Sequence, residues 1–192
     1  MKLSRVVRYS LAWLGFVAMG YALTLMFTDR VADDDANTSS AIVPPAGDDR
    51  GVDVNTIDIA LAVLGGGEQR LSAWQGKPLV VNFWATWCAP CRREIPLLKT
   101  LQDEYAADEL TVIGVAIDEM DAVQIYAEDA QFNYPVLVGE DSGFRMASAI
   151  GVQNFYVPIT AFVDRSGRVT RIHTGEVHRE DAELAIREIV AR

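Results

Sequence analysis

The chain has 192 residues, of which 50% are hydrophobic and 23% charged, and its 17 Lys and Arg against 27 Asp and Glu give a formal net charge of −10. This acidic balance argues against nucleic-acid binding through a basic surface, because that mode needs clustered cations to neutralise phosphates. With two cysteines, Cys88 and Cys91, the chain can build neither a multi-disulfide framework nor a four-cysteine zinc site.

An uncharged apolar run covers residues 9–28, and as a helix it would span roughly 30 Å, enough to cross a bilayer. Basic residues precede the run and several aspartates follow it, so the positive-inside rule places the N-terminus in the cytoplasm. We therefore predict that residues 1–28 form a single-pass inner-membrane anchor, with the remainder facing the periplasm. The alternative is a cleaved signal peptide ending near Gly20 and Ala22, which would export the same part of the chain.

Residues 29–54 are rich in Asp, Pro, Gly and small polar residues, and we expect them to form a flexible acidic linker. Residues 55–192 have the length of one domain, in which apolar runs of strand length alternate with amphipathic helical patterns. This alternation predicts a mixed α/β sheet covered on both faces. The predicted elements are a hairpin at 57–71, a strand at 79–84, a helix around 95–105, a strand at 110–117, a helix at 121–131, a strand at 135–138, a helix at 143–150, a hairpin at 160–173 and a helix at 182–190.

The two cysteines lie where the predicted strand at 79–84 leads into a helix. Cys88 falls at the helix N-terminus, where free backbone N–H groups and the helix dipole stabilise a thiolate. Cys91 is one turn further on the same side, so it can attack a mixed disulfide formed at Cys88 and release the partner. The pattern predicts a nucleophilic Cys88 and a resolving Cys91.

Three other uses of the cysteines are weaker. A structural disulfide closing so small a ring would add little stability through loop entropy. The only histidines, His173 and His178, lie more than 80 residues from Cys91, without the paired spacing of a zinc site. A peroxiredoxin-type peroxidase needs a Pro and a Thr set before its reactive cysteine, and residues 85–87, Ala-Thr-Trp, do not supply them.

The cysteines stand in a longer motif that resembles a known family. Gly76-Lys77-Pro78, followed at residues 80–96 by the sequence VVNFWATWCAPCRREIP, is similar to membrane-anchored, extracytoplasmic disulfide reductases typified by TlpA and ResA. The resemblance covers about 135 residues. It implies a thioredoxin fold with an N-terminal β-hairpin extension and an inserted helix and strand at 118–138. It also implies a thiol-disulfide oxidoreductase that uses its cysteine pair and no cofactor or metal.

The resemblance implies roles for further residues. Val157-Pro158 matches the family's cis proline, which faces the cysteines and exposes backbone groups to an extended substrate. Glu94 matches an acidic residue that modulates thiol proton transfer, with a solvated first-turn carboxylate as the alternative. Asn82 stands where cytoplasmic thioredoxins carry a buried Asp, so Glu94 is the better candidate acid. We expect Trp87 to shield the disulfide.

The loop at 151–160 departs from the family pattern, because it is longer and carries two adjacent aromatic residues, Phe155 and Tyr156. We hypothesise that both belong to a partner-docking rim; the alternative is that one of them packs inward. Reductases dedicated to cytochrome c maturation often carry an acidic residue just after the cis proline, and Ile159 is not acidic. The subgroup therefore stays open.

The expected function is reduction of protein disulfides outside the cytoplasm, with apocytochrome c or copper-site cysteines as substrates and a membrane electron-donor thiol protein as partner. We expect a monomer. A disulfide-forming oxidase of the same fold is one alternative, because sequence does not determine the redox potential. The other is a copper-binding chaperone module, for which His173 would be the additional ligand.

Overall fold

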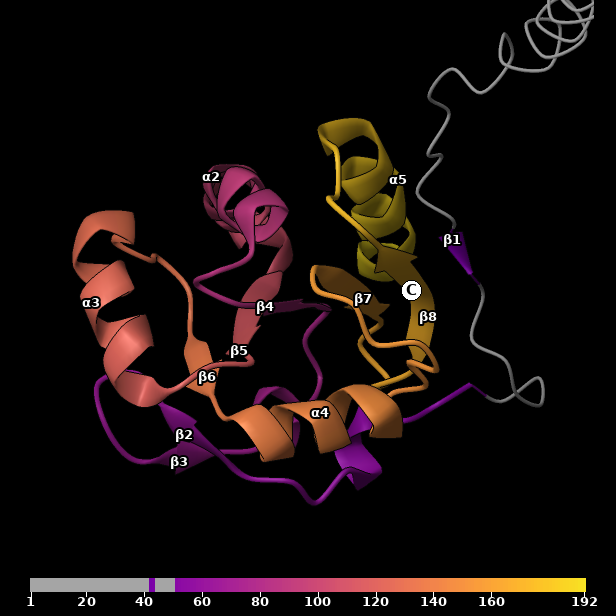
Figure 1. Ribbon diagram of the computed structural model, residues 1–192. Coiled ribbons are helices and arrows are strands. Elements are labelled where there is room, and N and C mark those ends of the chain that lie inside the picture. The colour runs from indigo at the N-terminus through magenta and orange to yellow at the C-terminus, as the bar shows by residue number, and fades with distance from the viewer. Residues whose placement is uncertain (1–41, 44–50) are drawn as a thin grey trace, which may run out of the picture. The chain divides into compact units, whose positions relative to one another are not determined.

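The computed structural model describes residues 42–43 and 51–192 of the chain (Figure 1). The predicted membrane anchor at 1–28 and most of the predicted linker lie outside the described residues. Within the described ranges, no helix is both long and apolar enough to cross a membrane.

The described strands form one mixed sheet of eight, in the order β1-β8-β7-β4-β5-β6-β2-β3. The neighbours β4, β5 and β6 are parallel, whereas the remaining pairs are antiparallel. This arrangement confirms the predicted mixed α/β sheet. The strands are β1 (Ile42–Val43), β2 (Leu61–Val63), β3 (Glu68–Gln69), β4 (Leu79–Trp84), β5 (Thr111–Ala116), β6 (Val136–Val138), β7 (Ile159–Val163) and β8 (Val169–Thr174).

Helices cover both faces of this sheet. Side chains of α2 (Ala89–Glu104), α3 (Met120–Ala130) and α5 (Arg179–Val190) share one apolar core with one face of β4. Those of α4 (Glu140–Ala149) share a second core with the other face. Figure 1 shows α2 and α5 above the sheet and α4 below it. Short 3-10 helices lie at Val54–Thr56, Leu71–Trp74 and Ala106–Asp108.

Strand β4 is the centre of the sheet, paired with β5 on one side and β7 on the other. All six of its residues are buried. Because side chains alternate along a strand, Val80, Asn82 and Trp84 face α2, whereas the other three face α4. Asn82 is the one polar residue of this strand, and a buried amide needs hydrogen-bond partners.

The two predicted additions to the thioredoxin fold are present. The N-terminal hairpin consists of β2 and β3, joined through Gly65, Gly66 and Gly67, all of which have positive φ and therefore suit glycine. The inserted segment forms α3 and β6. Strand β6 pairs with both β5 and β2, so the insertion attaches the hairpin to the edge of the central sheet.

Candidate active site

The cysteine pair lies at the start of α2, shortly after β4. Cys88 is the residue just before α2, and its Sγ accepts a hydrogen bond from the backbone N–H of Cys91 at 3.3 Å. The two cysteines form a disulfide with an S–S distance of 2.02 Å and a Cα–Cα distance of 5.3 Å. Pro90 occupies the first turn of α2, where its missing N–H costs no helical hydrogen bond.

The two cysteines differ slightly in their exposure to solvent. Cys91 is 0% exposed and Cys88 is 3% exposed. Cys88 is flanked by two exposed residues, Trp87 and Ala89. A thiol approaching from solvent therefore reaches Cys88 before Cys91. Trp87, expected to shield the disulfide, is 69% exposed and leaves most of its own surface available for contact.

The Val157–Pro158 peptide lies against the disulfide and is cis. The carbonyl oxygen of Val157 is 3.7 Å from Cys88 Sγ. The carbonyl oxygen of Pro158 accepts a hydrogen bond from the N–H of Gly175 at 2.9 Å. The structure thus brings the segment before β7 next to the cysteine pair, about 70 residues away along the chain.

The two aromatic residues of this loop point in different directions. The ring of Phe155 packs near Phe83 and Phe144, with centroid distances of 6.3 and 4.4 Å. Tyr156 is 74% exposed. The alternative that one of the pair packs inward therefore applies to Phe155, whereas Tyr156 is available to a partner.

Asp118 holds the loop that precedes Cys88, and the sequence analysis did not single it out. Its Oδ2 accepts hydrogen bonds from the backbone N–H and the hydroxyl of Thr86, at 2.9 and 2.7 Å. Asp118 comes shortly after β5, which is parallel to β4, so the ends of the two strands place it beside this loop. An aspartate just after the strand predicted next to the one that leads to the cysteines is the signal that could have identified Asp118.

Glu94 is buried beneath the disulfide end of α2, with 2% exposure, so it is not a solvated first-turn carboxylate. Both of its oxygens accept hydrogen bonds. Oε1 accepts from Asn82 Nδ2 at 2.7 Å, and Oε2 from the backbone N–H of Val177 at 2.9 Å. Burial raises the pKa of Glu94 from its ordinary 4.5 to about 7, although these two bonds favour the charged form. The carboxyl group can therefore exchange a proton near neutral pH.

Asn82 connects Glu94 to the strand β7. Its Nδ2 donates to Glu94 Oε1 and also, at 3.0 Å, to the hydroxyl of Thr160. Its two amide hydrogens thus serve two acceptors, the Glu94 carboxyl group and the Thr160 hydroxyl. Sequence reasoning missed Thr160 and Val177, because neither stands out in a local pattern. The available signal was Asn82, the one polar residue in an otherwise apolar strand, which indicates buried polar partners nearby.

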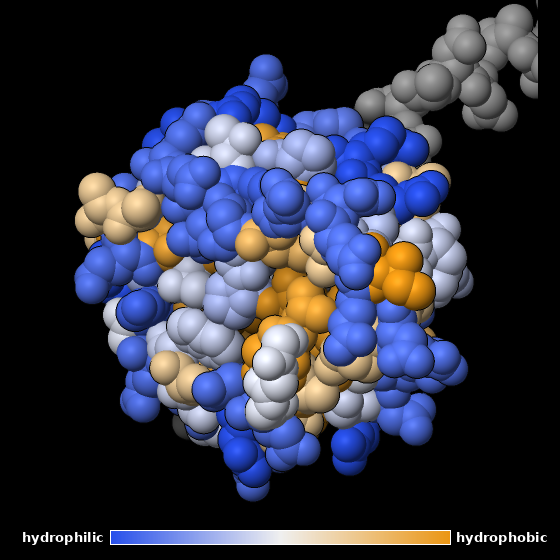
Figure 2. All heavy atoms as spheres, turned by 90° about the vertical axis from the view of Figure 1, so that its left-hand side faces the viewer, coloured by the Kyte–Doolittle hydropathy of each residue, from blue (hydrophilic) through white to orange (hydrophobic). Residues whose placement is uncertain are grey.

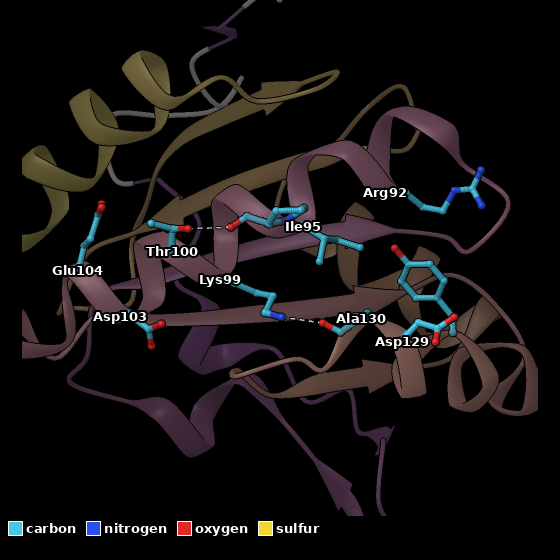
Figure 3. A pocket seen from close by; sticks show the side chains of 10 residues that line it. Arg92, Ile95, Lys99, Thr100, Asp103, Glu104, Asp129 and Ala130 are labelled. Atoms are coloured by element: carbon cyan, nitrogen blue, oxygen red, sulfur yellow. Dashed lines mark hydrogen bonds between the residues drawn. The ribbon is translucent and has the colours of Figure 1, made fainter.

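A groove of about 590 Å³ lies along α2 and α3, and its lining includes neither cysteine. Figure 3 shows Lys99 reaching across it, where Nζ donates to the carbonyl oxygen of Ala130 at 2.7 Å. The face of the molecule in Figure 2 is mostly hydrophilic around an apolar central area.

Within 51–192, no group of three His, Cys, Asp or Glu side chains is placed to hold a metal ion.

Comparisons with known proteins identify a family for this chain. The model of the AhpC/TSA family matches residues 52–172. The chain is 28% identical to thiol-disulfide oxidoreductase ResA of Geobacillus kaustophilus, over 96% of this chain and 95% of the relative. It is 32% identical to ResA of Geobacillus thermodenitrificans, over 65% and 70%.

Solved structures show the same fold. A thiol:disulfide interchange protein of the thioredoxin family from Chlorobium tepidum superposes with a TM-score of 0.64 at 25% identity, covering 75% of this chain and 99% of that one. A secreted thiol-disulfide isomerase from Corynebacterium glutamicum gives 0.64 at 27% identity, covering 71% and 85%.

The raised pKa of Glu94 predicts a pH-dependent stability. The unfolded chain loses the Glu94 proton near pH 4.5 and the folded chain near pH 7, so folded stability falls as pH rises through this window. Relative to Glu94→Gln, the wild type should lose about 3 kcal/mol of unfolding free energy between about pH 4 and about pH 8. Urea unfolding of the oxidised proteins measures this difference. Glu104→Gln, at an exposed carboxylate, should keep the wild-type dependence of unfolding free energy on pH. The prediction would be contradicted if the difference in unfolding free energy between the wild type and Glu94→Gln did not change with pH.

Proposed function

The chain belongs to the AhpC/TSA family and is a thiol-disulfide oxidoreductase of the ResA type, and we propose that it reduces protein disulfides outside the cytoplasm. One observation carries this proposal: a Cys88–Cys91 disulfide at the start of α2 with Cys91 wholly buried behind Cys88. This arrangement separates an attacking sulfur from a resolving one.

The proposed cycle begins with both cysteines reduced. The Cys88 thiolate, stabilised by the N-terminus of α2, attacks one sulfur of the substrate disulfide. A mixed disulfide forms, and the first substrate sulfur leaves as a thiolate that takes up a proton. Cys91 then loses its proton and attacks Cys88 Sγ. The second substrate thiol is released, and the two electrons have passed to the substrate.

Glu94 is the proposed proton acceptor for Cys91. It follows Cys91 by three residues on the same side of α2, and its pKa of about 7 lets it take and return a proton near neutral pH. Its hydrogen bonds to Asn82 and Val177 hold the carboxyl group in place. Cys91 has 0% exposure, so a buried base is needed to receive its proton.

The proposed substrate site is the surface around Cys88. An extended substrate segment would pair with the backbone of Val157 beside Pro158, because its carbonyl oxygen already lies 3.7 Å from Cys88 Sγ. Trp87, next to Cys88, and Tyr156, next to Val157, are both largely exposed and would contact the substrate. Phe155 supports this loop from within.

The cellular setting is proposed from the sequence. Residues 1–28 would anchor the domain in the inner membrane, with the linker at 29–54 and the thioredoxin-like domain at 55–192 in the periplasm. A membrane thiol protein would return electrons to the cysteine pair. The proposed substrates are apocytochrome c or copper-site cysteines, and the proposed state is monomeric.

Substitution of each cysteine tests the order of attack. Cys88→Ser should lower the rate of insulin disulfide reduction to the uncatalysed rate and should form no covalent complex with a substrate. Cys91→Ser should instead accumulate a mixed disulfide through Cys88, because nothing resolves it. Non-reducing electrophoresis with mass spectrometry identifies the linked cysteine. A complex trapped by Cys88→Ser would reverse the two roles.

The reducing direction is tested by the midpoint potential of the cysteine pair. A carboxylate one turn from Cys91 disfavours negative charge on the reduced cysteine pair, and destabilising the reduced form lowers the potential. We expect a value closer to thioredoxin's roughly −270 mV than to the about −120 mV of a strong oxidant. Glu94→Gln should move it to a less negative value. Equilibration with glutathione and dithiothreitol buffers measures the midpoint potentials of the wild type and of Glu94→Gln. A wild-type potential near the about −120 mV of a strong oxidant would overturn the reductase assignment.

The contribution of the exposed loop is tested at two adjacent residues. Tyr156→Ala should lower kcat/KM for a protein disulfide by about five- to thirtyfold, as expected for an aromatic contact residue. It should leave reduction of oxidised glutathione unchanged. Phe155→Leu should mainly reduce stability, by about 1 kcal/mol. Ile125→Ala, at an exposed position on α3, is the control. Equal kcat/KM for Tyr156→Ala and the wild type would remove Tyr156 from the substrate site.

A further inference from the structure

His173 is buried on the same face of the sheet as Asn82. It lies on β8 opposite Thr160 of β7, which in turn lies opposite Asn82 of β4. Directly opposed residues point to the same face, so these three polar residues form a row across the sheet beneath α2 and α5. His173 is 1% exposed, and a buried ring needs a defined hydrogen-bond partner.

The partner of the His173 ring determines its tautomer. Its Nε2 lies 3.2 Å from the carbonyl oxygen of Glu176. A carbonyl oxygen can only accept a hydrogen bond, so Nε2 must carry the proton and donate it. Burial lowers the pKa of His173, so near neutral pH the ring that donates is the neutral one.

The peptide group that accepts from His173 is the one that donates to Glu94. The carbonyl of Glu176 and the N–H of Val177 belong to the same peptide bond, and this N–H donates to Glu94 Oε2 at 2.9 Å. The bonds therefore run in one direction, from His173 through the peptide to the carboxylate. Such chains polarise each other, so donation at the carbonyl strengthens donation from the N–H.

Two other contacts hold this peptide in position. The N–H of Gly175 donates to the carbonyl oxygen of Pro158 at 2.9 Å. The guanidinium group of Arg93 binds the carboxylate of Glu176, with Nη2 to Oε2 at 2.5 Å. The turn before α5 is thus attached to the cis-proline segment and to α2, and the peptide has little freedom to move away from Glu94.

Other ionisable groups also act on the two ends of the chain of bonds. Near His173 these are Arg171 on β8, His178 just before α5 and Asp181 on α5. Near Glu94 they are Glu176 and the hydroxyl of Tyr134, with Arg93 bound to Glu176. His178 is exposed, so it offers a matched control for the loss of a histidine.

We propose that His173 is a positioning residue that sets the proton affinity of Glu94 through the Glu176–Val177 peptide. Its importance for thiol chemistry rests on the proposed function, but its effect on Glu94 does not. Loss of the ring donor weakens the bond from Val177 to the carboxylate, so Glu94 holds its proton more tightly. Glutamine at position 173 can keep an Nε2–H donor, whereas phenylalanine keeps only the shape of a ring.

The test is a 13C NMR titration of the Glu94 carboxyl carbon in the oxidised full-length protein. His173→Phe should lower the acid dissociation constant of Glu94 about two- to fourfold. This is the effect expected when a charge-assisted hydrogen bond loses the part of its strength that comes from polarisation by a neighbouring bond. His173→Gln should stay near the wild type, and His178→Gln should match it. An unchanged titration in His173→Phe, or an equal change in His173→Gln, would overturn the proposal.

A second measurement needs no variant at position 173. The 15N shifts of the His173 ring in the wild type should report a proton on Nε2; a proton on Nδ1 alone would overturn the proposal even if His173→Phe fails to fold. These readouts are independent of disulfide reduction. If the protein lacks reductase activity but Glu94 titrates as expected in the variants, the proposed function is rejected and this inference is retained. If the protein reduces disulfides but the Glu94 titration is unchanged in His173→Phe, the proposed function is retained and this inference is rejected.

Discussion

A buried carboxyl group is the constraint on which the rest of this site depends. Glu94 has 2% exposure, and an ionisable group so far from water is tolerated only with partners for both oxygens. Those partners come from β4 and from the turn before α5. Satisfying one side chain of α2 therefore fixes that helix against the central strand and the C-terminal part of the chain.

The same constraint places the proline segment. The turn that donates to Glu94 also donates, through Gly175, to the carbonyl of Pro158, and the preceding Val157 carbonyl contacts Cys88. The disulfide, the cis proline and the buried acid are thus linked by consecutive hydrogen bonds and contacts. A shift of any one of them would leave a buried polar group of another without its partner, which is costly. The site is preorganised by its own polar interior.

The two sides of the disulfide have opposite character. Below it lie the polar side chains of Glu94 and Asn82, enclosed by an apolar core. Next to Cys88 and Val157 in sequence lie Trp87 and Tyr156, with most of their surface exposed, which leaves both available for contact with another protein. Cys88 is at the boundary between these regions and Cys91 is inside. This separation is what a two-step exchange requires, because only the first step involves the partner's approach from solvent.

Much of this protein could be predicted from local sequence patterns. The strand and helix periods, the Cys88-to-Cys91 spacing at a helix start and the motif around it led to the mixed sheet, the thioredoxin fold and the inserted α3 and β6, because each depends on residues close together in the chain. The contacts of Glu94 depend on residues 12 and 83 positions away. The strand register that aligns Asn82, Thr160 and His173, and the packing that turns Phe155 inward and leaves Tyr156 exposed, arise only when distant segments meet. Tertiary structure decided them, because hydrogen-bond partners and burial are properties of the space around a side chain and not of its neighbours in sequence.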